Sequence, residues 1–129
     1  MGSLTDTAEI DILDHVFRNT AMTSPTTVYA ALFSAAPSDA AGGTELTGNG
    51  YTRIAITMGA AAAGAISNSA AVTFPTATGS NWAAATHFAI FDAATVGNMI
   101  AWGTLDASRT VLVGDNAEFA IAALAVTMD

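Results

Sequence analysis

The pattern of hydrophobic and polar positions changes along the chain, from a helical period to a period of 2. In the first part, Ile10, Leu13, Val16 and Phe17 follow the i, i+3, i+6, i+7 spacing of one apolar helix face. This spacing predicts an amphipathic helix over residues 6–18. Its apolar face is expected to pack either on a sheet or on a neighbouring subunit.

Residues at both ends of the predicted helix support these bounds. Asp6 and Glu9 have the spacing of a capping box, with Asp6 as the cap. Acidic residues in the first turn and Arg18 in the last turn both complement the helix dipole. Asn19 and Thr20 follow as the predicted end of the helix.

Beyond Pro25 the chain alternates with a period of 2, and turn signals such as GNG at 48–50 separate the alternating runs. The alanine-rich residues 58–71 are interpreted as a bulged strand or a flexible arm. The run at 28–33 is apolar at every position, which predicts a strand buried on both faces. The remaining strands are predicted at residues 51–57, 71–74, 86–92, 99–105, 109–113 and 118–128.

Short strands at this spacing, without βαβ alternation, predict a mainly β fold. We expect an antiparallel β-sandwich or jelly-roll-like barrel with one N-terminal α-helix. Residues 1–24 are predicted to form an N-terminal helical arm, and residues 25–129 a single β-sandwich domain.

Charge is scarce in this sequence. Only 11% of its 129 residues are charged, whereas ordinary soluble domains carry about 25%. A surface so poor in charge predicts extensive contact with other protein, so we expect a homo-oligomer, with a trimer favoured.

The net charge of −8 excludes some partners. There is no lysine, and three scattered arginines among eleven carboxylates cannot form a phosphate-binding patch, so no nucleic-acid partner is expected. No run approaches the roughly 18 strongly apolar residues of a spanning helix, so no membrane partner is expected either.

Candidate chemistry is equally sparse. The chain has no cysteine, and its two histidines, His15 and His87, lie on separate predicted elements without the spacing of a metal site. No nucleophile elbow, calcium loop or phosphate-binding loop is present. We therefore predict a protein that is not an enzyme, with no catalytic residue, cofactor or metal.

Four residues are candidates for a protein interface. Three of them, Ile10, Leu13 and Phe17, form the apolar face of the predicted helix. The fourth, Trp82, follows the loop residues GSN at 79–81, where it is either tucked beneath the loop or available to a partner.

Six motifs follow one another along nearly the whole chain. They are IDILDHVFRNT at 10–20, VYAALF at 28–33, GYTR at 50–53, AVTFP at 71–75, THFAIFDA at 86–93 and AWG at 101–103. In this order the motifs resemble those of a family of small tailed-phage virion proteins that are often labelled tail fibre proteins.

This resemblance implies a non-enzymatic virion protein. The favoured hypothesis is a head decoration (cement) protein that binds the major capsid protein and stabilises the assembled head. The alternatives are a tail or tail-fibre subunit that binds tail protein and contacts the host surface, and a small carbohydrate-binding module. A receptor or sugar binder is expected to expose aromatic residues in its loops, and only Trp82 is a clear candidate.

Overall fold

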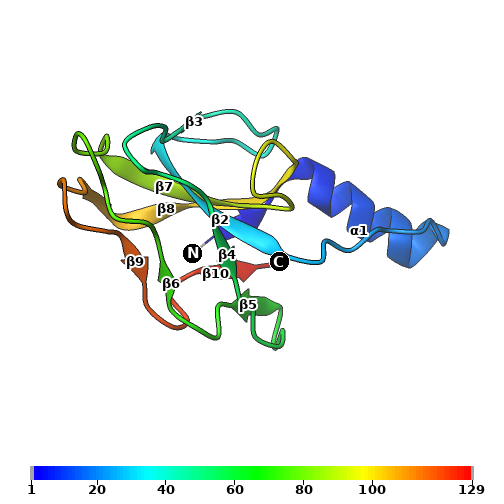
Figure 1. Cartoon of the computed structure of the whole chain (residues 1–129). Helices are drawn as coiled ribbons and strands as arrows, with labels where there is room; N and C mark the ends of the chain where they lie inside the picture. The colour runs from blue at the N-terminus through cyan, green and yellow to red at the C-terminus, as the bar shows by residue number, and fades with distance from the viewer. Residues whose placement is uncertain (1, 129) are drawn as a thin grey trace.

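The computed structural model describes residues 2–128 and confirms a mainly β fold with one N-terminal helix (Figure 1). The elements, in chain order, are β1 (Gly2–Leu4), α1 (Asp6–Arg18), β2 (Val28–Ala35), β3 (Thr44–Glu45), β4 (Ile54–Ile56), β5 (Ala65–Ser67), β6 (Val72–Thr73), β7 (Ala85–Phe91), β8 (Met99–Arg109), β9 (Glu118–Phe119) and β10 (Ala125–Thr127).

One large sheet forms most of the body, in the order β3-β2-β7-β8-β1-β10-β5, with β4 also paired to β2. All of its pairings are antiparallel except that between β1 and β10, and β6 with β9 forms a second, two-stranded sheet. The large sheet curls until the chain after β4 meets β5, where the Gly59 amide donates to the Ser67 carbonyl. The result resembles a sandwich, and the ladder does not close into a barrel.

The main core lies inside this curled sheet and is rich in aromatic residues. The ring of Tyr51 stacks on Phe74, with centroids 6.1 Å apart, and meets the edge of Trp82 at 5.4 Å. Burial raises the pKa of Tyr51 far above its ordinary value, so its hydroxyl stays protonated. That hydroxyl donates to Glu45 Oε1 and accepts from the Leu32 amide, which satisfies a polar group at the edge of the core.

The central strands are buried on both faces, as the apolar run at 28–33 predicted. Alternate residues of β2 and β7 enter the main core. The residues between them form a second cluster on the outer face of the sheet, with Met99 from β8. The members of this second cluster are Ala31, Phe33, Ala89, Phe91 and Met99.

Tertiary pairing decided several strands that the sequence pattern did not indicate. β1 and β3 were not predicted, and β8 continues as one strand to Arg109 where a separate strand was expected at 109–113. Residues 58–71 hold the short strand β5 after a tight turn, and its pairing with β10 has no register shift, so the segment contains a strand without the expected bulge. Gly2 fits only because it lacks a side chain: a Cβ there would lie 2.9 Å from the carbonyl oxygen of Trp102.

The helix has the predicted bounds but a different cap. Its N-cap is Thr5, whose hydroxyl accepts from the Ala8 amide, so the expected Asp6 cap is wrong. Asn19 ends the helix in the left-handed conformation, as predicted. No helix within residues 2–128 is long and apolar enough to cross a membrane. The division into an arm at 1–24 and a domain at 25–129 stays a prediction, although β1 places Gly2–Leu4 in the sheet.

Two leucine truncations test how differently the core and the helix contribute to stability. Leu124 is fully buried, so Leu124→Ala should lower the free energy of unfolding by about 2–5 kcal/mol. Leu13 is 55% exposed, so Leu13→Ala in dilute protein should change it by no more than about 0.5 kcal/mol. Urea denaturation of both variants measures the difference, and similar losses would contradict the placement of α1 outside the core.

Candidate interaction surfaces

The helix α1 is held to the body at its first residues, where Thr5 is buried. The Thr5 hydroxyl donates to the carbonyl of Met99 (2.8 Å), and the Thr5 amide donates to the carbonyl of Ile100 (2.9 Å). The Asp6 amide donates to the carbonyl of Asp39 in the β2–β3 loop. These bonds fix the direction of the helix, which projects from the body in Figure 1.

The chain after the helix returns along the polar side of α1. Residues 20–26 line a pocket together with Asp11 and Asp14 of the helix, so the two segments face each other. The Thr20 carbonyl also lies 3.1 Å from Nδ1 of His15. Figure 1 shows the returning segment beside the helix. Because this segment follows the polar side, it leaves the opposite, apolar side uncovered.

The apolar face of α1 is exposed along its whole length. Ile10 is 58% exposed, Leu13 55%, Val16 63% and Phe17 78%, and no residue of the helix is buried. Of the two expectations for this face, packing on the sheet of the same chain is therefore wrong. Packing on a neighbouring subunit stays a prediction. A contiguous apolar stripe on a projecting helix is a typical interaction surface.

An apolar groove lies at the base of this stripe, between α1 and the strands β1 and β10. It holds about 300 Å³ and is lined mainly by Leu4, Ile12, Leu13 and Met128, with the Glu9 carboxylate at its rim. The groove therefore continues the stripe from the helix onto the body.

Trp82 does not contribute to this surface. Its side chain is 3% exposed, and its indole N–H donates to the carbonyl of Asn49 (2.9 Å). Of the two positions left open for Trp82, the structure shows the one beneath the loop.

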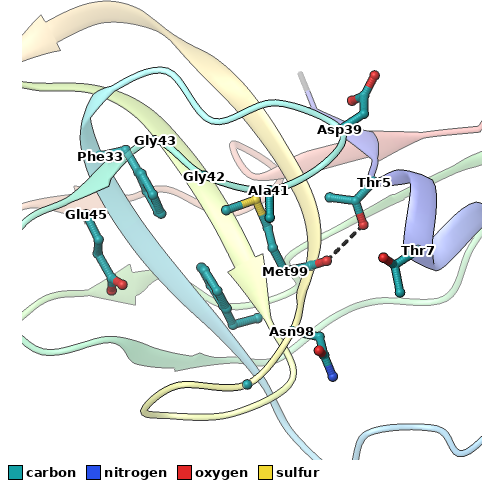
Figure 2. Close-up of a pocket in the computed structure, with 12 residues that line it drawn as sticks. Thr5, Thr7, Phe33, Asp39, Ala41, Gly42, Gly43, Glu45, Asn98 and Met99 are labelled. Atoms are coloured by element: carbon teal, nitrogen blue, oxygen red, sulfur yellow. Dashed lines mark hydrogen bonds between the residues drawn. The ribbon is translucent and has the colours of Figure 1, made fainter.

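A second candidate is the pocket of about 380 Å³ between the start of α1 and the β2–β3 loop (Figure 2). Its floor is the outer aromatic cluster, in which Phe33 and Phe91 stack with centroids 6.3 Å apart beside Met99. Figure 2 shows Glu45 and Asn98 at opposite sides of this floor.

Arg53 contacts two residues that line this pocket, Glu45 and Phe91, and sequence analysis did not single it out. Its side chain is 8% exposed, and its guanidinium donates to both oxygens of Glu45 at 2.8 Å and lies 3.5 Å above the Phe91 ring. It also donates to the carbonyls of Ala93 and Val96 in the β7–β8 turn. The one feature of the sequence that could have indicated this role is the position of Arg53 as a single cation within the alternating residues 51–57.

The polar groups around this pocket are already bonded within the chain. Glu45 is engaged by Arg53, Asn98 donates to Asp92, and Asp39 accepts from the Trp102 indole. No buried side-chain nitrogen or oxygen in residues 2–128 lacks a partner. The pocket therefore offers a ligand few free donors or acceptors, and we interpret it as part of the scaffold.

The β7–β8 turn is shaped by the same interactions. Val96 has a φ of 56°, a region that β-branched residues rarely adopt, and its carbonyl accepts a hydrogen bond from Arg53 (2.7 Å). The Asp92 carboxylate accepts from the backbone and the side chain of Asn98, and the backbone bond is the main cause that lowers the pKa of Asp92.

The histidines lie apart from one another and from any cluster of ligands. His15 is exposed on α1, whereas His87 is half-buried near the ring of Trp102. Within the part of the chain that the structure describes, no three His, Asp or Glu side chains converge as a metal site would require.

Comparison with known families gives one match over almost the full length. Residues 3–127 match the family described as Podophage GP4 fiber I protein gp80. No curated protein matches the chain at a significant level.

A carboxylate-to-amide pair tests the role of Arg53. Glu45→Gln should lower the free energy of unfolding by about 1–3 kcal/mol, because it leaves a buried guanidinium without its anion. Asp14→Asn is the matched control. It removes the anion from the exposed Arg18 and should cost no more than about 0.5 kcal/mol. Equal losses in urea denaturation would contradict a structural role for Arg53.

The Asp92 turn predicts a pH dependence of stability. The folded pKa of Asp92 lies below its ordinary value of 3.8, so its contribution is complete at neutral pH and is lost as the pH falls through the folded pKa. Urea denaturation from neutral pH to about pH 2 should show wild type more stable than Asp92→Asn at neutral pH. The difference should disappear in acid, and a constant difference would exclude Asp92 as its source.

Proposed function

The chain belongs to the podophage GP4 fiber I protein family, and on this basis we propose that it is a non-enzymatic structural subunit of a phage fibre. Its place is in the virion, where it assembles with tail protein and contributes to contact with the host surface. The observation that carries this proposal is the family match over residues 3–127.

The arrangement of the body supports a structural role. Its core is closed around packed aromatic residues, and its buried cation is paired with Glu45 and stacked on Phe91. Side chains that could have formed a ligand site are bonded to one another instead. A body of this kind suits a component that must keep its shape within an assembly.

We propose that α1 is the assembly element of this subunit. Its apolar face and the groove at its base form one continuous surface, and Thr5 fixes how that surface is presented. Contacts with other protein would remove Ile10, Leu13 and Phe17 from water, which is favourable by roughly 25 cal/mol for each Å² of apolar surface buried.

Head decoration, which the sequence favoured, is now the less supported alternative. Low surface charge suits either location, whereas the family description names a fibre. A carbohydrate-binding module is supported less still. Among the large hydrophobic side chains exposed within residues 2–128, the single aromatic one is Phe17, on the helix and not in a loop.

Deletion of the gene from its phage tests this proposal. Adsorption to the host should fall, because a fibre subunit is missing, while the temperature of genome release from the heads should stay unchanged. The two properties are measured separately on purified particles, with complementation by the wild-type gene as the control. Normal adsorption with heads that rupture at lower temperature would instead support the decoration hypothesis.

A further inference from the structure

We propose that Asn49 is a site of spontaneous deamidation, at which the chain modifies its own backbone, and that Trp82 restrains the reaction. Asn49 is exposed and precedes Gly50, and no other asparagine or aspartate in the sequence precedes a glycine. Asparagine is among the thermolabile residues of proteins. It reacts most readily before glycine, where no side chain shields the following amide nitrogen. The site is separate from the apolar surface of α1, so the inference goes beyond the proposed function.

The fold itself places a glycine after Asn49. The Tyr51 amide donates to the Gly48 carbonyl (2.9 Å) and closes a tight turn. Asn49 and Gly50 both have a positive φ, at 51° and 83°, which matches a type I′ turn and favours this pair of residues. A Cβ at position 50 would also lie 2.9 Å from the carbonyl oxygen of Thr76. The turn therefore imposes on Asn49 the following residue that makes it most reactive.

The reaction needs only water as a second reactant. The backbone nitrogen of Gly50 attacks the side-chain carbon Cγ of Asn49 and loses its proton, and a C–N bond forms. The side-chain nitrogen Nδ2 leaves as ammonia, and a cyclic succinimide remains. Water then opens the ring at either carbonyl. One product is aspartate. The other is isoaspartate, in which the main chain passes through Cβ and Cγ and the former backbone carbonyl becomes a free carboxylate.

Two hydrogen bonds to the backbone carbonyl of Asn49 oppose ring closure in the folded chain. The carbonyl oxygen accepts from the Trp82 indole N–H and from the Thr78 amide, each at 2.9 Å. Closure turns the Cα–C bond of Asn49 so that the Gly50 nitrogen faces Cγ, and this rotation moves the carbonyl oxygen away from both donors. The reaction therefore proceeds from a locally opened turn, at a rate set by how often the turn opens.

Deamidation would loosen the loops that meet at this turn. The Trp82 amide donates to the Val111 carbonyl and the Ala77 amide to the Asp115 carbonyl, so residues 76–82 join the turn to the segment between β8 and β9. Figure 1 shows that segment, in orange, at the end of the body away from α1. In isoaspartate the carbonyl that holds the indole lies outside the main chain, which is longer by one methylene group. The buried indole then loses its acceptor and becomes accessible to water.

Incubation of the full chain in mildly alkaline buffer tests the proposal, because base removes the proton from the attacking nitrogen. Peptide mapping by mass spectrometry should find aspartate and isoaspartate at position 49 before any other asparagine has reacted. Asn49→Gly removes the amide but accepts a positive φ, so it should abolish this release of ammonia. Asn116→Gly is the matched control. It removes an exposed amide that precedes Ala117, and it should leave the release of ammonia unchanged.

Trp82→Phe tests the restraint. The phenyl ring keeps an aromatic group in the core but has no N–H, so the release of ammonia should accelerate about 2- to 10-fold, the factor for one net hydrogen bond. Wild type unfolded in urea should react at least as fast, because it lacks both bonds, and this comparison does not require the variant to fold. Tryptophan fluorescence of folded wild type should shift to longer wavelength as deamidation proceeds, and that of Asn49→Gly should not.

Three outcomes would overturn the proposal. One is folded wild type that yields no product at position 49 over many half-lives of the unfolded chain, and another is a product that appears first at a different asparagine. The third is an equal rate in folded wild type, folded Trp82→Phe and the unfolded chain, which would show that Trp82 restrains nothing. All of these measurements are made on the isolated chain, so the fibre proposal stands or fails independently of them.

Discussion

The bonds made by Thr5 determine how this protein presents the apolar face of α1. One side chain caps α1 through the Ala8 amide and, through its buried hydroxyl, holds the start of the helix to the Met99 carbonyl in β8. The helix is anchored at this end, and the segment that follows it, residues 20–26, returns along the polar side of α1. As a consequence the apolar stripe is excluded from the core of its own subunit and faces outward at a fixed angle. An unanchored helix with the same composition would gain most by folding back onto an apolar surface.

Arg53 plays the corresponding role on the outer face of the sheet. It joins β3 to the β7–β8 turn through Glu45 and the Val96 carbonyl, and it covers Phe91. A buried guanidinium is tolerated where its charge is paired and most of its donors are bonded. Here Glu45 pairs the charge, and four of the five N–H groups donate to Glu45 and to the carbonyls of Ala93 and Val96. The chain thus uses one of its three cations internally, which leaves its surface acidic and poor in basic groups.

These two features fit a protein that works through assembly. The aromatic core and the bonded pocket form a closed body, whereas the projecting helix leaves its hydrophobic residues exposed to water. Membership of a podophage fibre family gives such a surface an evident use, since a fibre subunit must bind its neighbours in a fixed geometry. The Glu9 side chain, which lines the groove beside this stripe, also restricts which groups a partner can place there.

The sequence by itself determined the mainly β class, the bounds of the helix, the doubly buried β2 and the apolar face of α1, because each depends on a local period of side chains. It did not determine the strands β1 and β3, the Thr5 cap or the Arg53–Glu45 pair. Two- and three-residue strands carry no periodic signal, and their pairing is decided by residues distant in the chain. Trp82 and α1 also show what a sequence pattern cannot determine. Both were candidates for a partner, and only the tertiary packing buried the tryptophan and exposed the helix, since burial depends on what the rest of the fold leaves room to cover.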